Sequence, residues 1–336
     1  MNTYTHKYAQ RSITSRTLVS GFSMIEMMVS ITIGLMIIAA LVAVLAGASG
    51  NTKTNDRTSE LQSNGRFALD HLKRELRHAG YRGYTAKAPV STSLVTPVIS
   101  GECGTAGSFV KNIRQAVWGA NDNNPFNANC IPATSYLTGD VLVIRHADDA
   151  PITAANATPS TIYLRSTYGL ASLLQGSAVP AAVTIGTENF ALLEYVYYIS
   201  PFTNSIATTG IATENPQVPA LYRIALQADG SMTPELVVSG IEQFQVEYGF
   251  ATRIGELQST QYFPANSING GHSATGATSW DSISSVRIWL LARNAKPETG
   301  YSNTETYTLS TALTPKSDSF RRQVFTTVVQ LRNFRN

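Results

Sequence analysis

The chain has 336 residues, of which 43% are hydrophobic and 14% are charged, and its formal net charge is +3. So small a net charge gives no reason to expect direct binding to nucleic acid. The scarcity of charged residues, together with many small polar ones, suits an extracellular surface better than a cytosolic enzyme.

A basic segment without acids comes first and is followed by a long apolar run. The basic residues are Lys7, Arg11 and Arg16, and the 22 residues from 27 to 48 carry no charge. A helix of that length is about 33 Å long, which is enough to cross the hydrocarbon core of a bilayer. Because cationic flanks stay on the cytoplasmic side, the sequence predicts one membrane span with the N-terminus inside.

Two simple interpretations of this run explain it only in part. Residues 46–48, Ala-Gly-Ala, imitate a signal peptidase site, but the apolar run is longer than the usual signal sequence of about 7 to 15 residues. A plain membrane anchor accounts for the length but leaves Glu26 unexplained. An unpaired carboxylate in hydrocarbon costs roughly 2.5 kcal/mol or more.

A third interpretation accounts for every feature of the segment. "SGFSMIEMMVS" resembles the class III signal of type IV prepilins, in which a membrane protease cuts after a Gly and the new N-terminal residue is methylated. The resemblance implies a cleaved leader at 1–21, cleavage after Gly21, methylation of Phe22, and a role for Glu26 in subunit assembly. Removing the leader lowers Lys plus Arg from 25 to 22, equal to the 22 acids, so the mature formal charge is zero.

In an assembled pilus, the carboxylate of Glu26 can neutralise the terminal ammonium of a neighbouring subunit. Two buried charges that are costly alone then become one pair. On this interpretation, Glu26 functions in subunit assembly, and it is not merely an unfavourable charge in a membrane anchor.

The helical pattern continues past the membrane. We expect a transmembrane half at 22–48 and an amphipathic half at 49–80 that ends at Gly80. The apolar positions of the second half recur at spacings of three, four or seven: Leu61, Ala68, Leu72, Leu76 and Ala79. Local unwinding is expected at the glycines within this stretch: Gly34, Gly47, Gly50 and Gly65.

Residues 81–140 are rich in Gly, Pro, Ser, Thr and Asn, and they predict a long irregular connection. On the oxidising side of the membrane, Cys103 and Cys130 within it are expected to form a disulfide, which stabilises by roughly 3 kcal/mol. "NDNNPFNANC" offers oxygen ligands to calcium, but it lacks the acidic spacing of a known loop, so an Asn-rich turn is favoured. We expect no metal site.

Residues 141–336 predict a β-rich globular domain. "FQVEYGF" alternates well, and the other β-branched and aromatic runs are "VLVIR", "TIYLR", "FALLEYVYYIS", "LYRIAL", "VRIWLLAR" and "VFTTVVQLRN". Because few helical spacers separate these runs, an antiparallel sheet packed against the N-terminal helix is the economical arrangement. The predicted fold is therefore α+β and pilin-like. "RHADDA", at 145–150, is interpreted as a solvated turn after a strand.

Four later segments resemble the PilW family of type IV pilus minor pilins: "LDHLKRELRHAGYRGY", "SGIEQFQVEYGF", "VRIWLLARN" and "RRQVFTTVVQLRN". The N-terminal signal is common to all type IV pilins and pseudopilins, so it indicates only the class. The resemblance implies a minor pilin that acts with other minor pilins to prime pilus assembly, at the pilus tip, in support of twitching motility, adhesion or DNA uptake.

The same resemblance implies the partners and the location. The partners are other minor pilins, the major pilin, the prepilin peptidase, the inner-membrane assembly platform and the lipid bilayer. The subunit is expected in the inner membrane with its globular domain in the periplasm, and then at the pilus tip and cell surface after assembly.

No catalytic function is expected, because the sequence has no G-x-S-x-G elbow, no P-loop and no H-E-x-x-H motif. No cofactor is expected either. Two alternatives stay open: a minor pseudopilin of a type II secretion system, and a tip adhesin whose loops bind a surface ligand.

Overall fold

The computed structural model describes most of the chain. The described residues are 21–85, 99–104, 108–181, 185–204, 214, 216–251, 259–271 and 279–333. They form two compact units, Met1–Asn55 and Asp56–Asn336, each of which is described by itself. The basic residues of the predicted leader, Lys7, Arg11 and Arg16, lie outside the described residues.

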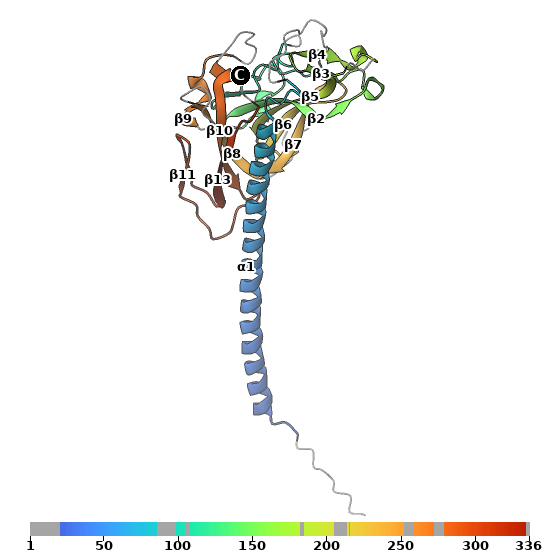
Figure 1. Cartoon of the computed structure of the whole chain (residues 1–336). Helices are drawn as coiled ribbons and strands as arrows, with labels where there is room; N and C mark the ends of the chain where they lie inside the picture. Colours follow the sequence, from blue (N-terminus) through green and yellow to red (C-terminus); the bar gives the residue numbers. More distant parts are fainter. Residues whose placement is uncertain are drawn as a thin grey trace, which may run out of the picture. The chain divides into compact units, whose positions relative to one another are not determined.

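One long helix, α1 (Met24–His78), accounts for the predicted helical stretch (Figure 1). It is unbroken, so the unwinding expected at its four glycines is not observed. Intrahelical hydrogen bonds persist through a glycine because that residue weakens a helix by only about 1 kcal/mol relative to Ala. The helix stops two residues before Gly80, whose φ of 76° lies in the left-handed region that ends many helices.

The second unit contains a β-rich domain in which all pairings between the described strands are antiparallel. A seven-stranded sheet contains β1 (Val117–Ala120), β2 (Val141–Ile152), β3 (Ile162–Thr167), β4 (Ala171–Gln175), β5 (Thr187–Ser200), β6 (Ala220–Leu226) and β7 (Met232–Ser239). A four-stranded sheet has the order β13-β10-β8-β9, with β8 (Ile241–Ala251), β9 (Ser259–Pro264), β10 (Ile283–Arg293) and β13 (Arg322–Gln330). A separate two-stranded ribbon pairs β11 (Thr306–Leu309) with β12 (Ala312–Pro315).

These observations confirm the α+β fold class, but the single sheet that we expected is wrong. The strands divide among three sheets, and the long strand β5 explains why the first of them forks. β5 pairs with β2 along one edge, while its other edge pairs first with β3 and then with β6. Fourteen residues in one strand are enough to serve two neighbours in succession.

Short 3₁₀ turns complete the described secondary structure: η1 (Ala133–Ser135), η2 (Ala154–Asn156), η3 (Gly176–Ala178), η4 (Ala265–Ser267) and η5 (Ser279–Ser282). The predicted connection at 81–140 contains β1 and η1, and its other described residues are irregular or in turns. β1 was not expected there, because four residues are too few to show an alternating pattern.

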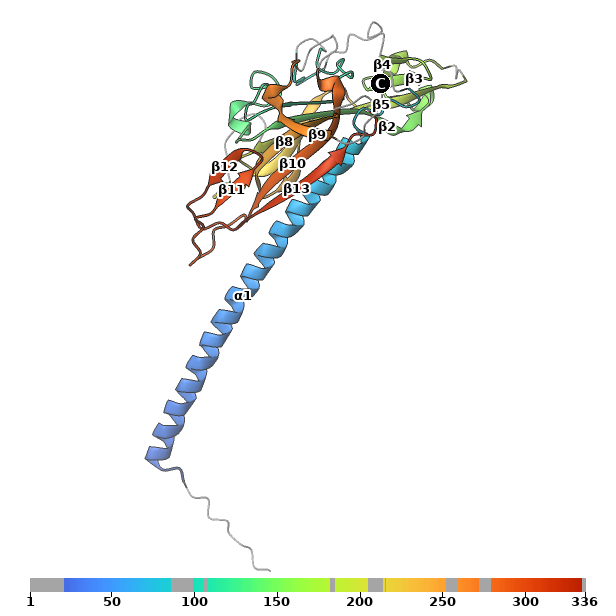
Figure 2. The ribbon, with the colours of Figure 1, turned by 60° about the vertical axis from the view of Figure 1, so that its left-hand side comes forward.

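Within the second unit, the later turns of α1 pack against both larger sheets. All five predicted apolar positions, from Leu61 to Ala79, are at most 5% exposed, which confirms their helical spacing. His71 hydrogen bonds to Tyr197 of β5, and Gly65 lies against the ring of Phe325 in β13. β13 runs beside this part of α1 (Figure 2).

An aromatic cluster joins the two larger sheets through residues of β1, β8 and η5. The ring of Trp280 meets Tyr248 of β8 edge to face, with ring centroids 4.8 Å apart, and lies 5.9 Å from Trp118 of β1. Both indole N–H groups donate to the carbonyl oxygen of Gly270, at 2.9 and 3.1 Å. Both indole N–H groups are therefore satisfied, whereas the buried hydroxyl of Tyr248 has no hydrogen-bond partner among the described residues.

Candidate functional site

The predicted cleavage point lies just before α1, in the first unit. Gly21 and Phe22 precede the helix without regular secondary structure, and the Phe22 side chain is 87% exposed. No atom comes within 4 Å of the place where a Cβ on Gly21 would lie. Since a protease binds its substrate as an extended backbone, an open and non-helical peptide bond is the geometry that cleavage requires.

Glu26 has a local role that the sequence interpretation did not include. Its Oε2 accepts a hydrogen bond of 3.0 Å from the backbone N–H of Ser23, and the Oγ of Ser23 accepts one of 3.3 Å from the N–H of Ile25. This exchange is a capping box, in which Ser and Glu three residues apart satisfy the unpaired donors of the first turn. The pattern S-x-x-E is visible in "SMIE" and was the signal that could have revealed it.

The apolar residues that follow are uncovered within the first unit. From Met24 to Leu45, the large hydrophobic side chains are between 51% and 86% exposed. This helix is the one in the described part of the chain that is long and apolar enough to cross a membrane, with a mean hydropathy of 2.7 in its best window. A helix that is hydrophobic all round needs an apolar environment, which fits a single-pass membrane anchor.

Cys103 and Cys130 are joined by a disulfide, with their Cα atoms 4.7 Å apart, as predicted. The Asn-rich turn beside them is held by its own amides. The side chain of Asn124 donates to the carbonyl of Ile131 at 2.8 Å, and that of Asn129 donates to the carbonyl of Cys103 at 3.1 Å. These amides therefore serve the turn, and among the described residues no group of three or more His, Cys, Asp or Glu is placed to hold a metal ion.

The interpretation of "RHADDA" as a solvated turn is wrong. β2 continues through it, and Arg145 and His146 are buried. Arg145 forms a fully buried ion pair with Glu194 of β5 at 3.1 Å and donates to the carbonyls of Gln115 and Phe109. Because a guanidinium carries five donors, one arginine can hold a neighbouring strand and an irregular segment together.

His146 faces the helix rather than the acid pair that follows it in sequence. Its Nε2 lies 3.2 Å from Oε2 of Glu75, and its Nδ1 lies 2.8 Å from the carbonyl of Ala147. Burial raises the pKa of Glu75, but the hydrogen bond and charge of His146 outweigh it and leave that pKa below its ordinary value. The ring of His146 thus lies between two acceptor oxygens, one from the helix and one from its own strand.

His71, one helical turn before Glu75, lies beside a guanidinium and a tyrosine hydroxyl. Its Nδ1 lies 3.3 Å from a guanidinium nitrogen of Arg74, which can only donate, so Nδ1 accepts. The Nε2–H then donates to the hydroxyl of Tyr197 at 3.0 Å. Burial lowers the pKa of His71, and the nearby Arg223 and Arg74 act in the same direction against the charge of Glu75.

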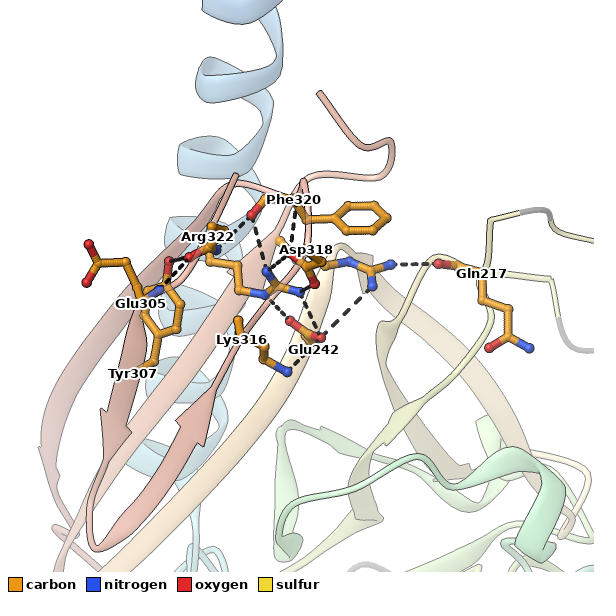
Figure 3. A network of polar contacts seen from close by, with 10 residues as sticks. Gln217, Glu242, Glu305, Tyr307, Lys316, Asp318, Phe320 and Arg322 are labelled. Atoms are coloured by element: carbon orange, nitrogen blue, oxygen red, sulfur yellow. Dashed lines mark hydrogen bonds and ion pairs between the residues drawn. The ribbon is translucent and has the colours of Figure 1, made fainter. Parts of the chain in front are cut away.

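An ionic network closes the four-stranded sheet where β10 ends and β13 begins (Figure 3). Glu242, at the start of β8, accepts hydrogen bonds from Arg322 at 2.5 Å and Lys316 at 3.0 Å. Asp318 accepts two more from Arg322, at 2.6 and 2.7 Å, and the ring of Phe320 lies under the guanidinium of Arg293 at 4.2 Å. The network therefore holds both ends of the segment 294–321, which connects β10 to β13 and contains the β11–β12 ribbon.

Asn333, which follows the end of β13, contacts the C-terminal end of α1. The side-chain amide nitrogen of Asn333 lies 3.2 Å from each of the carbonyl oxygens of Arg77, His78 and Ala79. The last carbonyls of a helix have no intrahelical donor, so this contact is a C-terminal cap supplied from a distant part of the sequence. Nothing local in the sequence indicates it.

The comparisons concern this C-terminal part above all. The model of the PilW family, type IV pilus-assembly protein W, matches residues 196–333. Residues 196–333 are thus similar to the PilW family. The PilW match thus contains the ionic network around Glu242 and Arg322 and the cap made by Asn333.

Other comparisons add little to the PilW assignment. A type IV-like pilin from Thermus thermophilus is similar in structure, with a TM-score of 0.35 and 14% sequence identity, over 84% of this chain and 100% of that one. At such a score and identity, it adds nothing to the PilW match. Among curated proteins, no sequence matches the chain.

Proposed function

We propose that the protein is a type IV pilus minor pilin that, with other minor pilins, primes pilus assembly at the tip. The observation that carries this proposal is the PilW match over residues 196–333. The exposed apolar helix that starts beside Phe22 and Glu26 supports it, because an assembling subunit needs a segment that leaves lipid and enters a bundle. Twitching, adhesion or DNA uptake would follow from the pilus, and the subunit itself would have no catalytic role and no cofactor.

The proposed maturation begins with the prepilin peptidase, which removes 1–21 and leaves Phe22 as an N-methylated terminus. The subunit then waits in the inner membrane with its N-terminus on the cytoplasmic side, beside the assembly platform, before it joins the other minor pilins and the major pilin. Mass spectrometry of the N-terminal peptide tests this step. A chain that starts after Ala48, or that retains Met1, would exclude the pilin assignment.

Glu26 would change partners during assembly. In the isolated subunit its carboxylate accepts the N–H of Ser23. In the pilus we expect it to pair with the Phe22 ammonium of a neighbour, where two charges in a low dielectric attract strongly. The capping bond keeps the carboxylate satisfied until that exchange, and so lowers the cost of an acid in lipid.

Substitution of Glu26 separates anchoring from assembly. Glu26→Ala should be cleaved and inserted normally, because Ala costs less than Glu in lipid, yet it should enter pili poorly. Glu26→Lys should be worse, since two like charges would meet. The measurement is the amount of subunit in sheared pili, normalised to the amount in membranes, and equal incorporation of all three proteins would contradict the assembly role.

Deletion of the gene distinguishes the proposed function from its alternatives. Loss of pili and of twitching supports priming by a minor pilin. Loss of protein secretion with normal pili would instead indicate a type II secretion pseudopilin. Normal pili with lost attachment would indicate a tip adhesin.

A further inference from the structure

Charged residues are unevenly distributed by sign along the exposed face of α1 within the second unit. Two acids, Asp56 and Glu60, come first along this face, and Arg57 between them is half-buried and donates to the carbonyl of Pro297. Beyond them lie four cations, Arg66, Lys73, Arg74 and Arg77, which we call the cationic stripe. At 100° per residue, the four side chains fall within about one third of the helix circumference.

The stripe is largely unpaired in the subunit. Among the described residues, no ion pair involves Arg66, Lys73 or Arg77. Arg74 forms an ion pair with Glu75, at 3.7 Å, and also donates to His71. The helix dipole favours cations, but its effect is confined to the last turn, which includes Arg77. Arg66 lies three turns before the helix end and needs another explanation.

Two further features indicate a protein partner rather than an anionic lipid surface. Phe67 lies beside the stripe, and 52% of its surface is exposed. The domain buries other apolar residues of this helix, such as Leu72, completely, so Phe67 is a large apolar side chain that the domain leaves uncovered. Asp70 lies within the stripe. An acid in the middle would be repelled by a sheet of anionic headgroups, whereas a patterned protein surface can pair with it.

We propose that the cationic stripe docks an acidic helix face of a neighbouring pilin subunit. This inference rests on the proposed function and names the partner chemistry for it. The midpoint of Asp56 and Glu60 lies about 14 to 15 residues before the mean position of the four cations, or roughly 22 Å along the helix. A neighbour with the same charge separation, displaced by about that distance, would bring its acids against these cations.

A photo-crosslinking residue in place of Phe67 tests the contact in cells that assemble the pilus. The expected adduct joins this position to a helix of another pilin-class subunit, within one or two turns of Asp or Glu residues. An adduct to lipid, to a neutral or basic segment, or to this chain's own domain would overturn the proposal. Raised ionic strength during detergent extraction should weaken the contact, because screening acts on exposed pairs.

Charge reversal gives the matched comparison. In the crosslinking background, the triple variant Arg66→Glu, Lys73→Glu, Arg77→Glu should reduce the adduct on the order of tenfold, since like charges at an interface cost more than 1.4 kcal/mol. A control with the same change in net charge, Lys111→Glu, Arg165→Glu, Lys296→Glu, should leave the adduct unchanged. Equal loss in both variants, or no loss in the first, would refute the docking surface.

The outcomes separate this inference from the function on which it rests. If deletion of the gene abolishes pili while the reversed stripe enters pili normally, the docking surface is wrong and the pilin assignment stands. If the reversed stripe loses its acidic helical partner while deletion leaves pili intact, the surface stands and the priming role fails.

Discussion

The two halves of α1 have the same backbone conformation and opposite surroundings. From Met24 to Leu45 the large apolar side chains are at least half exposed, whereas Leu72 and Leu76 are completely buried. The first half is apolar all round, and the second carries its apolar residues on one stripe. Helical conformation alone therefore does not predict whether a helix is buried. The distribution of apolar residues around the helix is a better indicator.

The sharpest test of this comparison removes one leucine from each half. Leu72→Ala should lower the free energy of unfolding of the β domain by about 2 to 5 kcal/mol, because it leaves a cavity in a closed core. Leu41→Ala, at a side chain that is 56% exposed, should change it by less than about 0.5 kcal/mol. Urea unfolding of the full-length protein in detergent, followed by tryptophan fluorescence, measures both. Similar losses would show that the domain depends on the apolar half.

Glu26 and Glu75, one acid from each half of α1, allow the same comparison for charge. Glu75→Ala leaves His146 buried beside no carboxylate and should cost roughly 2 to 3 kcal/mol. Glu75→Gln, which can still accept a hydrogen bond, should lose less. Glu26→Ala should not alter the unfolding of the domain at all. If Glu75→Ala has the same free energy of unfolding as the wild type, the contact between His146 and Glu75 does not stabilise the domain that packs against the second half of α1.

Glycines in the two halves should respond to alanine in opposite ways. A Cβ on Gly65 would lie 2.2 Å from the ring of Phe325, so Gly65→Ala should destabilise by about 1 to 3 kcal/mol despite the better helix propensity of Ala. Gly50→Ala, which meets nothing within 4 Å, should be neutral or stabilising. Phe325→Leu in the Gly65→Ala background should recover part of the loss. Failure of that rescue would place the strain elsewhere.

The smallest expected effect is a pH dependence of the free energy of unfolding, and it arises only from the second half of α1, which is packed against the β domain. Because the folded state lowers the pKa of His71 below 6.5, the unfolded chain takes up its proton first, and stability falls as pH drops from 7.5 towards 5.5. With solvent screening, the loss should stay below about 1 kcal/mol. His71→Gln keeps a donor to Tyr197 but does not titrate, so its stability should fall less over the same range. Parallel curves would exclude His71 as the cause.

Much of this fold could be predicted because it follows local patterns. The spacing of Leu61, Ala68 and Leu72 shows which face of α1 is buried, and the alternation in "FQVEYGF" correctly places Phe244, Val246 and Tyr248 inside. The domain boundaries at 48, 80 and 140 remain predictions, as do the roles of Gly21, Phe22 and Glu26.

The remainder depends on contacts that no local pattern encodes. Arg145 looked like a surface residue because its partner Glu194 is 49 positions away. β7 was missed because it contains Pro234, which suits an edge strand but spoils a sequence pattern. The division of strands among three sheets depends on how β5 shares its edges, and the pattern of a strand does not reveal its neighbours.

The cap that Asn333 places on α1 also sets an order of events. Its partners are 254 to 256 residues earlier in the chain, so the end of the helix is secured only after nearly the whole domain has been synthesised. Until then, the side of α1 that contacts β13 has nothing to cover it. Contacts closed over so long a span form late and slowly. A newly synthesised chain is therefore most vulnerable while its apolar half is complete and the second half of α1 is still uncovered, and chaperones or proteases act on it most readily at that stage.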